Sequence, residues 1–149
     1  LPSPAAPQLP PRLFALAPAA APQRFAASAA SLPAWHLNVQ PPHFVALKTR
    51  ATGEHLPEEW LAFVAYEASE ETGGAIARLA VESDGRTLPE RDAVHEWGER
   101  FYPLRGKKFG PSIVATDVVV PADKLSELSA KIAQKFGDEF IFEATAEGS

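Results

Sequence analysis

The stretch EEWLAFVAYEAS, residues 58–69, decides the fold that we predict for this chain. Its residues alternate in character from Trp60 to Glu67, which is typical of a β-strand. The short apolar run RLFALA, Arg12–Ala17, is bounded by prolines and is also predicted as a strand. A β-sheet is therefore the expected framework of the chain.

Residues 34–50, AWHLNVQPPHFVALKTR, are predicted as two further strands. The sequence alternates on both sides of the Pro41–Pro42 break, so we expect strands at Trp35–Val39 and Phe44–Arg50. The segment ATGEHLPE, residues 51–58, contains glycine and proline and is expected to form a hairpin loop. A hairpin at this point makes the neighbouring strands antiparallel.

Four segments have the patterns of helices, and they are residues 21–33, 69–85, 89–102 and 121–137. In the second segment, Ser69 precedes two glutamates, which predicts a capped helix start, and Gly85 is expected to end the helix. In the last segment, an apolar stripe runs up to Gly137, and Glu127 and Lys131 form a supporting i, i+4 pair.

Two more strands are predicted near the end of the chain, at residues 111–120 and 139–146. The first, PSIVATDVVV, is apolar on both faces apart from Asp117, as expected of a central strand. The order of strands and helices predicts an α+β domain, in which helices back an antiparallel sheet in two layers. Ferredoxin-like topology is the nearest named arrangement.

The composition limits the classes of function that are open to the chain. Its formal net charge is −5 and its pI is about 5.4, which argues against a nucleic-acid-binding role. It has no cysteine, so disulfides, thiolate nucleophiles and thiolate metal sites are excluded. No apolar run approaches the roughly 20 residues that span a bilayer, and we expect a soluble, cytoplasmic protein.

The chain is expected to be a piece of a longer polypeptide, or a processed one. It begins at Leu1 and contains no methionine, whereas removal of an initiator methionine normally leaves a small residue. Residues 1–11 are rich in proline and are predicted to be a linker or inter-element segment, so the folded domain is expected at residues 12–149.

The usual catalytic and metal-binding groupings are missing from the sequence. The four histidines are His36, His43, His55 and His95, and none has the spacing of metal-ligand pairs, so no metal site is expected. Gly73–Gly74 does not belong to a phosphate-binding fingerprint, and no nucleophile–base grouping is present. By itself, the chain does not have the residues of a complete active site.

A basic segment lies between Trp97 and Gly110. It contains Arg100, Arg105, Lys107 and Lys108 against Glu99 alone, a local net charge of +3 in an acidic chain. Such a group can hold a carboxylate or phosphate, and an arginine fork matches a carboxylate with two parallel hydrogen bonds. The alternative is a solvated loop whose cations balance neighbouring acids, and charge alone favours this alternative.

The motifs around this basic segment resemble a known family. WGERF at Trp97–Phe101, KKFGPS at Lys107–Ser112 and DVVVP at Asp117–Pro121 precede an amphipathic helix. This arrangement is similar to the C-terminal, substrate-side domain of FAD-linked oxidases of the vanillyl-alcohol oxidase type. That family includes glycolate oxidase, D-lactate dehydrogenase and the flavin-dependent alkyl-glycerone-phosphate synthase. The similarity is densest at residues 95–137, and upstream only the order of elements agrees.

The resemblance implies a ferredoxin-like cap domain that covers the isoalloxazine ring of FAD, while a separate N-terminal domain binds most of the cofactor. The implied reaction is oxidation of a small 2-hydroxy acid such as glycolate or D-lactate. Arg100 stands where relatives have an arginine that can contact the substrate carboxylate, and Lys107 and Lys108 are further candidates for binding an anionic substrate. Trp97 is expected to pack its helix, and Asp117 to pair with Arg100 or Lys108 as structural support.

Two features depart from the family pattern. Ala115 replaces a lysine that some hydroxy-acid dehydrogenases have two residues before the aspartate. The H-x-G-D-G-N-x-H segment of metal-dependent members does not follow the last strand, so it either lies beyond residue 149 or is absent from this branch.

Two other functions stay open at this point. The same basic segment suits a free-standing ferredoxin-like module that binds a small anion or a partner protein. A noncatalytic subunit of a flavoenzyme complex would keep the fold and lose the need for Arg100. An open sheet edge can also pair with another copy of the chain, which gives a homo-oligomer, or with the missing domain.

Overall fold

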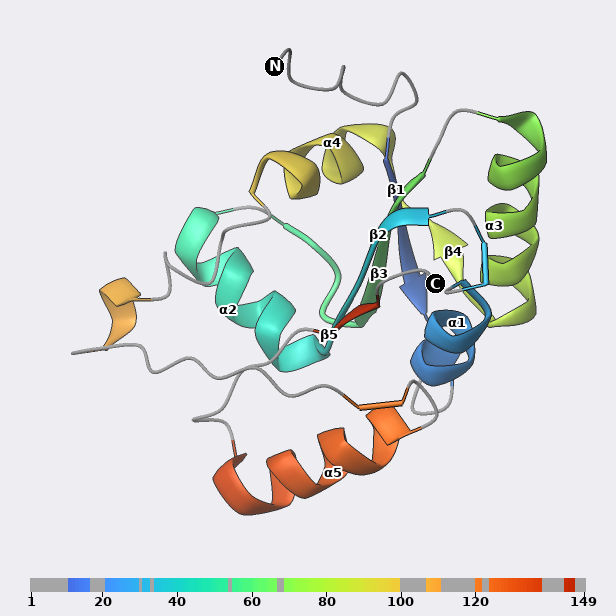
Figure 1. Cartoon of the computed structure of the whole chain (residues 1–149). Coiled ribbons are helices and arrows are strands. Elements are labelled where there is room, and N and C mark those ends of the chain that lie inside the picture. Colours follow the sequence, from blue (N-terminus) through green and yellow to red (C-terminus); the bar gives the residue numbers. More distant parts are fainter. Residues whose placement is uncertain are drawn as a thin grey trace, which may run out of the picture.

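The computed structural model describes residues 11–16, 21–29, 31–32, 34–53, 55–66, 69–99, 107–110, 120–121, 124–137 and 144–146. They form a sheet with strand order β4-β1-β3-β2-β5, in which all neighbours are antiparallel (Figure 1). The strands are β1 (Arg12–Leu16), β2 (Ala34–Gln40), β3 (Trp60–Tyr66), β4 (Arg86–Thr87) and β5 (Ala144–Ala146). Helices pack against this sheet, so the predicted α+β fold is confirmed.

The central strand of the sheet is β3, which lies where the sequence predicts it. Every residue from Leu61 to Tyr66 is buried. Phe63 pairs with Leu13 of β1 on one side and with Asn38 of β2 on the other. The alternation along β3 therefore does not separate a wet face from a dry face, because helices cover both faces of the strand.

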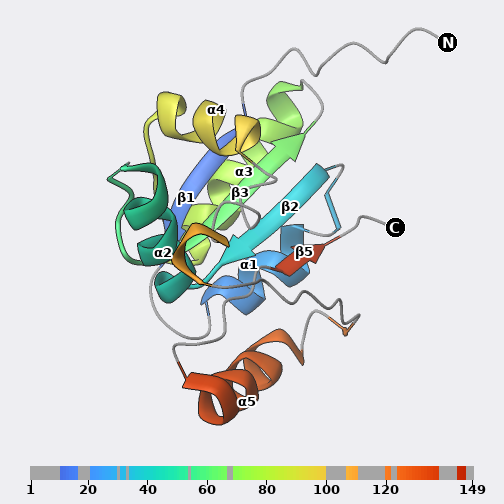
Figure 2. The ribbon, with the colours of Figure 1, turned by 90° about the vertical axis from the view of Figure 1, so that its left-hand side faces the viewer.

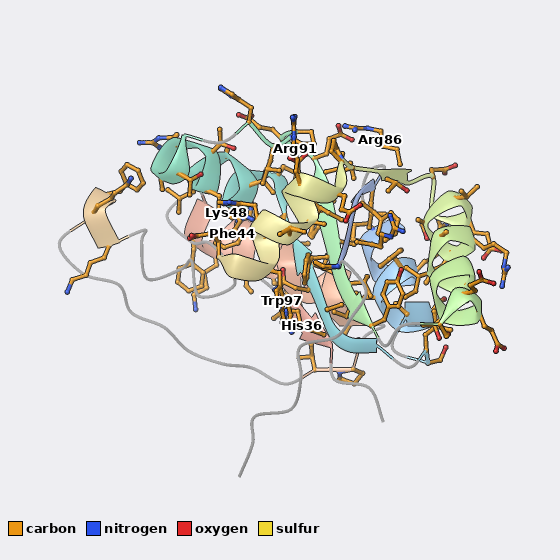
Figure 3. The ribbon with its side chains drawn as sticks, turned by 90° about the horizontal axis from the view of Figure 1, so that it is seen from above. His36, Phe44, Lys48, Arg86, Arg91 and Trp97 are labelled. Atoms are coloured by element: carbon orange, nitrogen blue, oxygen red, sulfur yellow. The ribbon has the colours of Figure 1, made fainter. Side chains whose placement is uncertain are left out.

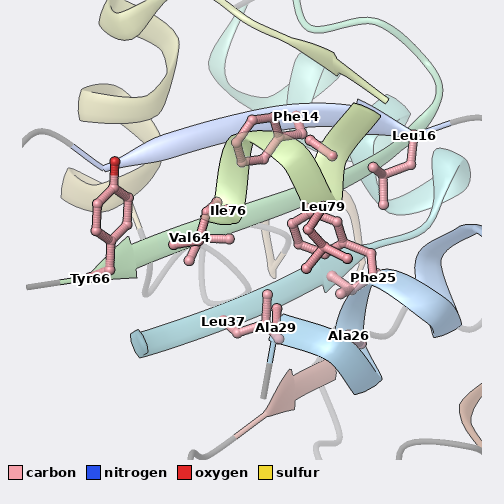
Figure 4. Packing of buried hydrophobic residues seen from close by; sticks show 13 residues of the cluster. Phe14, Leu16, Phe25, Ala26, Ala29, Leu37, Val64, Tyr66, Ile76 and Leu79 are labelled. Atoms are coloured by element: carbon pink, nitrogen blue, oxygen red, sulfur yellow. The ribbon is translucent and has the colours of Figure 1, made fainter. Parts of the chain in front are cut away.

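Helices α1 (Ala21–Ala29) and α3 (Glu70–Glu82) cover one face of the sheet (Figure 4). Both helices lie within the segments that the sequence predicts as helical. The ring centroids of Phe14, on β1, and Phe25, on α1, are 5.7 Å apart. The buried cluster on this face consists of Phe14, Leu16, Phe25, Ala26, Ala29, Leu37, Val39, Ala62, Val64, Tyr66, Ile76, Leu79 and Ala80.

The start of α3 is fixed by Ser69, as the sequence indicates, whereas its C-cap is Ser83 and not the predicted Gly85. The side-chain oxygen of Ser69 accepts a hydrogen bond from the backbone N–H of Thr72 at 3.0 Å, which satisfies a donor at the helix start. After the helix, a Cβ at Gly85 would lie 2.8 Å from the carbonyl oxygen of Ala80. Only glycine fits this close approach of the backbone.

The opposite face of the sheet is covered by α2 (Pro42–Thr52) and α4 (Glu90–Gly98) (Figure 1). The domain therefore has helices on both faces of the sheet, whereas the sequence predicts helices on one face only. The strand predicted at Phe44–Arg50 is wrong, because these residues belong to α2. Pro41 is the extended N-cap and Pro42 is the first helical residue, a position that needs no N–H donor. The proline pair therefore begins a helix instead of interrupting two strands.

The remaining features of α2 also identify a helix. Phe44 and Lys48 are both buried and are four residues apart, which places them on one helical face. The helix ends at Gly53, whose φ of 78° is left-handed and whose N–H donates to the carbonyl of Thr49 at 2.8 Å. The predicted hairpin loop at residues 51–58 is consequently wrong, because this segment closes α2 and leads into β3.

Helix α5 (Leu125–Phe136) lies within the segment predicted at residues 121–137, and it is the lowest element in Figure 2. Gly137 follows it with a φ of 58°, and Lys131 Nζ donates to Glu127 Oε1 at 2.7 Å, as the i, i+4 spacing predicts. None of the helices in the described part of the chain is long and apolar enough to cross a membrane.

Several predicted elements fall partly or wholly outside the described residues. These are the linker at residues 1–11 apart from Pro11, the last residues of the helix predicted at 89–102, and the strand predicted at 111–120 apart from Val120. Of the strand predicted at 139–146, the structure describes β5.

Candidate functional site

Two of the predicted substrate-binding residues, Lys107 and Lys108, lie in a short exposed turn. Trp97 lies near the end of α4. Arg100 and Asp117 lie outside the described residues, so the predicted pairing of Asp117 with Arg100 or Lys108 stays a prediction. The described part of the candidate site is therefore the lysine-containing turn and the C-terminal end of α4.

The turn at residues 107–110 lies against the C-terminal end of α2. Lys108 Nζ donates a hydrogen bond to the backbone carbonyl of Ala51, in the last turn of this helix. The final carbonyls of a helix lack intrahelical partners, and the negative end of the helix dipole favours a cation. Lys108 therefore has a structural partner within the chain.

An exposed phenylalanine joins this turn to α2 in a basic–aromatic cluster, which consists of Arg50, Lys107, Lys108 and Phe109. The guanidinium carbon of Arg50 lies 5.0 Å from the ring centroid of Phe109, and Lys108 Nζ lies 5.1 Å from it. Both distances are within the range of cation–π contacts. Phe109 is 43% exposed, so the cluster lies at the surface.

The basic–aromatic cluster brings Arg50 and Lys108 onto one ring from two distant parts of the sequence, and Lys107 precedes Lys108 in the turn. A guanidinium such as that of Arg50 can offer two parallel hydrogen bonds to a carboxylate or a phosphate, and lysine acts as a point charge beside it. The sequence prediction missed Arg50 because it assigned this residue to a strand. Pro41–Pro42, interpreted as a helix start, would have placed Arg50 in the last turn of a helix.

Trp97 packs the last turn of α4 onto the sheet. Its ring is stacked on that of Phe63 with an interplanar angle of 17° and a centroid distance of 6.0 Å. His36, on β2, meets Trp97 edge to face at 6.1 Å, and Figure 3 shows the two side chains next to each other. The two rings beneath Trp97 therefore come from adjacent central strands.

A buried polar network holds the same turn of α4 to α2 and β2, and it consists of Gln40, Lys48 and Glu96. Lys48 Nζ forms an ion pair with Glu96 Oε2 and donates to Gln40 Oε1 at 2.8 Å. Gln40 Nε2 donates to Glu96 Oε2 at 3.2 Å. The three residues are 4–6% exposed, so both charges of the ion pair are removed from water.

The Gln40–Lys48–Glu96 network is energetically expensive. Removal of two charges from water carries a desolvation cost that their mutual attraction does not always offset. In addition, Glu96 Oε1 is buried and has no hydrogen-bond partner within the described part of the chain. The network fixes the position of the last turn of α4, because the carboxylate of Glu96 connects this turn to α2 through Lys48 and to β2 through Gln40.

The described residues do not fit the role of holding FAD. A glycine-rich turn ahead of a helix start is the usual cradle for a nucleotide phosphate. Gly73 and Gly74 instead lie inside α3, where Gly73 N–H donates to the carbonyl of Ser69. Nor does the described part of the chain contain a group of three or more His, Cys, Asp or Glu side chains placed to hold a metal ion.

Comparisons with known proteins identify no relative of this chain. No protein-family model, no curated protein and no solved structure matches it.

Proposed function

We propose that this chain is the substrate-side cap domain of an FAD-dependent oxidoreductase that oxidises a small 2-hydroxy acid such as glycolate or D-lactate. FAD supplies the redox chemistry and, in this proposal, is bound mainly by a separate N-terminal domain, which is the chain's chief partner. The chain contributes recognition of the anionic substrate, through Arg100 with Lys107 and Lys108.

The position of the last turn of α4, directly ahead of Arg100 in the sequence, carries this proposal. Glu96 fixes this turn through its buried ion pair with Lys48, and Trp97 fixes it by stacking on Phe63. Arg100 follows Trp97 by three residues. A charged side chain that orients a substrate is most effective when it is mounted on a rigid element. These two contacts fix the residues that directly precede Arg100, and we propose that Arg100 benefits from that rigidity.

The basic–aromatic cluster supports the same function. Arg50, Lys107 and Lys108 concentrate positive charge on the surface of an otherwise acidic chain. A local positive potential raises the concentration of a small anion and the rate at which it arrives. The cluster is therefore suited to attract a hydroxy acid, whereas Arg100 is the proposed direct contact with the carboxylate.

The sheet topology is compatible with a ferredoxin-like cap domain. In the strand order β4-β1-β3-β2, α1 connects β1 to β2 and α3 connects β3 to β4. These are the connections of the split βαβ arrangement. We propose that α2, between β2 and β3, and the edge strand β5 are additions to it. A cytoplasmic location and a homo-oligomeric state are further parts of the proposal.

The test of the proposed carboxylate contact compares Arg100→Ala with Arg91→Ala in the intact flavoenzyme. Loss of a charge-assisted hydrogen bond of about 2 kcal/mol lowers kcat/KM roughly 30-fold, and we expect this for Arg100→Ala with glycolate or D-lactate. Arg91 is the matched control, because it lies on α4 with an 86% exposed side chain and pairs with Asp92. An unchanged kcat/KM for Arg100→Ala would refute the proposed contact.

A second candidate is an anion-binding module without catalytic activity. It is favoured by the basic–aromatic cluster, which forms entirely from described residues of this chain. This candidate predicts that Lys107→Ala and Arg50→Ala weaken binding of a small anion to a protein that contains no flavin. Flavin in the purified native protein would exclude it.

A further inference from the structure

A pocket of about 220 Å³, open to the surface, lies between the sheet and α3, on the face opposite α2 and α4. Its lining residues are Arg12, Phe14, Tyr66, Gly73, Ala77 and Thr87. None of them is acidic. The pocket and the basic–aromatic cluster lie on opposite sides of the sheet, because the cluster is at the end of α2.

Arg12 gives this cavity a positive charge. Its Nε donates to the hydroxyl oxygen of Tyr66 at 3.5 Å, which is the outer limit of a hydrogen bond. Within the described part of the chain, no carboxylate pairs with Arg12. A guanidinium stays charged at all physiological pH values, and burying part of it without a counter-charge is costly. An anion in the cavity would remove that cost.

Two hydroxyl groups and an apolar surface complete the lining. Tyr66 is 4% exposed, and Figure 4 shows its hydroxyl directed toward the start of β1. Thr87, on β4, pairs with Phe14, so the threonine lies beside the aromatic ring at the same level of the sheet. A charged fork with two hydroxyls suits a carboxylate, and Phe14 with Ala77 suits a short hydrocarbon tail.

The pocket is open to solvent, since its lining residues Ala77 and Thr87 are exposed, and its volume of about 220 Å³ is sufficient for a small ligand. We propose that this cavity, the Arg12 pocket, binds a small carboxylate with a short apolar tail, held by the guanidinium of Arg12 and the hydroxyls of Tyr66 and Thr87. The Arg12 pocket is independent of the proposed oxidase function, because it uses none of the residues on which that function rests.

Two adjacent glycines of α3 provide a matched pair of variants. A Cβ at Gly73 would lie 3.2 Å from the Tyr66 hydroxyl oxygen, so Gly73→Ala crowds the pocket. A Cβ at Gly74 would meet only Arg78 Nη1, at an ordinary contact distance of 3.6 Å. Both substitutions favour the helix to the same extent, and only the first one changes the pocket.

The experiment is calorimetric titration of the full chain at low ionic strength, with propionate and inorganic phosphate as separate titrants. We expect saturable propionate binding that is weakened at least about tenfold by Arg12→Gln, as for loss of a charge-assisted hydrogen bond. Gly73→Ala should weaken binding too, whereas Gly74→Ala and Lys131→Ala, which removes an exposed lysine of α5, should not. Circular dichroism checks that each variant is folded.

Four results would overturn the proposal. The first is the absence of saturable propionate binding to the unaltered chain. The second is equal propionate affinity in the unaltered chain and folded Arg12→Gln. The third is binding of phosphate but not propionate through Arg12, which would exclude a carboxylate as the ligand. Lower affinity in Lys107→Ala than in Arg12→Gln would place the anion in the basic–aromatic cluster and would also contradict the proposal.

Discussion

Replacement of Glu96 by alanine should be among the most destabilising substitutions in this protein. Glu96 and Lys48 are 5% and 4% exposed, so the substitution leaves a buried ammonium without its carboxylate. Removal of one partner of a buried ion pair costs about 3–5 kcal/mol. Native domains are stable by only about 5–15 kcal/mol, so Glu96→Ala should remove a large part of the total.

The double variant Lys48→Met, Glu96→Leu separates the buried charge from the loss of packing. It leaves no unpaired charge, and the remaining penalty is the side-chain amide of Gln40, which loses both partners in the network. An unsatisfied buried polar group costs about 1–3 kcal/mol. We therefore expect the double variant to be more stable than Glu96→Ala alone.

Urea unfolding measures these differences, with tryptophan fluorescence and far-ultraviolet circular dichroism as the two probes. The control is Lys131→Ala, which breaks the exposed pair with Glu127 on α5. Exposed pairs contribute about 0–1 kcal/mol, so the control should have a nearly unchanged midpoint. A Glu96→Ala variant that is as stable as this control would refute the reasoning, because the ion pair could not then be buried.

Two further predictions concern the end of α2 and the exposed pair on α5. Gly53→Ala should lower the free energy of unfolding by about 1–2 kcal/mol, because φ at Gly53 is 78° and alanine is strained there. Gly98→Ala is the control, since a Cβ at Gly98 meets nothing within 4 Å, and equal thermal midpoints in the two variants would count against the left-handed cap. The pKa of Glu127 is lowered from its ordinary 4.5, first by the hydrogen bond from Lys131 and then by the charges of Lys131 and Lys124. Because the folded-state pKa is the lower one, the stabilisation from this pair is present above pH 4.5 and is lost as the pH falls through the folded-state value. Carbon-13 NMR titration should give a higher Glu127 pKa in Lys131→Ala, and an identical pKa in the two proteins would contradict this assignment.

The parts of the fold that the sequence predicts correctly are those with strong local signals. Trp60–Tyr66 combines alternation with aromatic and branched residues, and α3 has a serine cap at its start. The segment at residues 42–52 was predicted wrongly because seven alternating residues are too few to distinguish a strand from one face of a helix. The proline pair before it and Gly53 after it were the decisive signals for a helix.

The candidate site is less accessible to prediction because its contacts are distant in the sequence. The density of positive charge in the sequence is enough to identify Lys107 and Lys108. It does not indicate that Phe109, which Lys108 contacts, also contacts Arg50 of α2. Lys48 and Glu96 are 48 residues apart, and no local pattern pairs them. The position of Trp97 on Phe63 likewise depends on which face of the sheet carries α4, and that face is set by packing rather than by periodicity.

The most direct test of the central claim is the absorption spectrum and mass of the native polypeptide, captured from its source cells with an antibody against this chain. We predict a polypeptide several times longer than 149 residues, with flavin absorption bands that bleach when glycolate or D-lactate is added without oxygen. A colourless native polypeptide of this length would contradict the proposal that the chain is the cap domain of a flavin-dependent oxidoreductase.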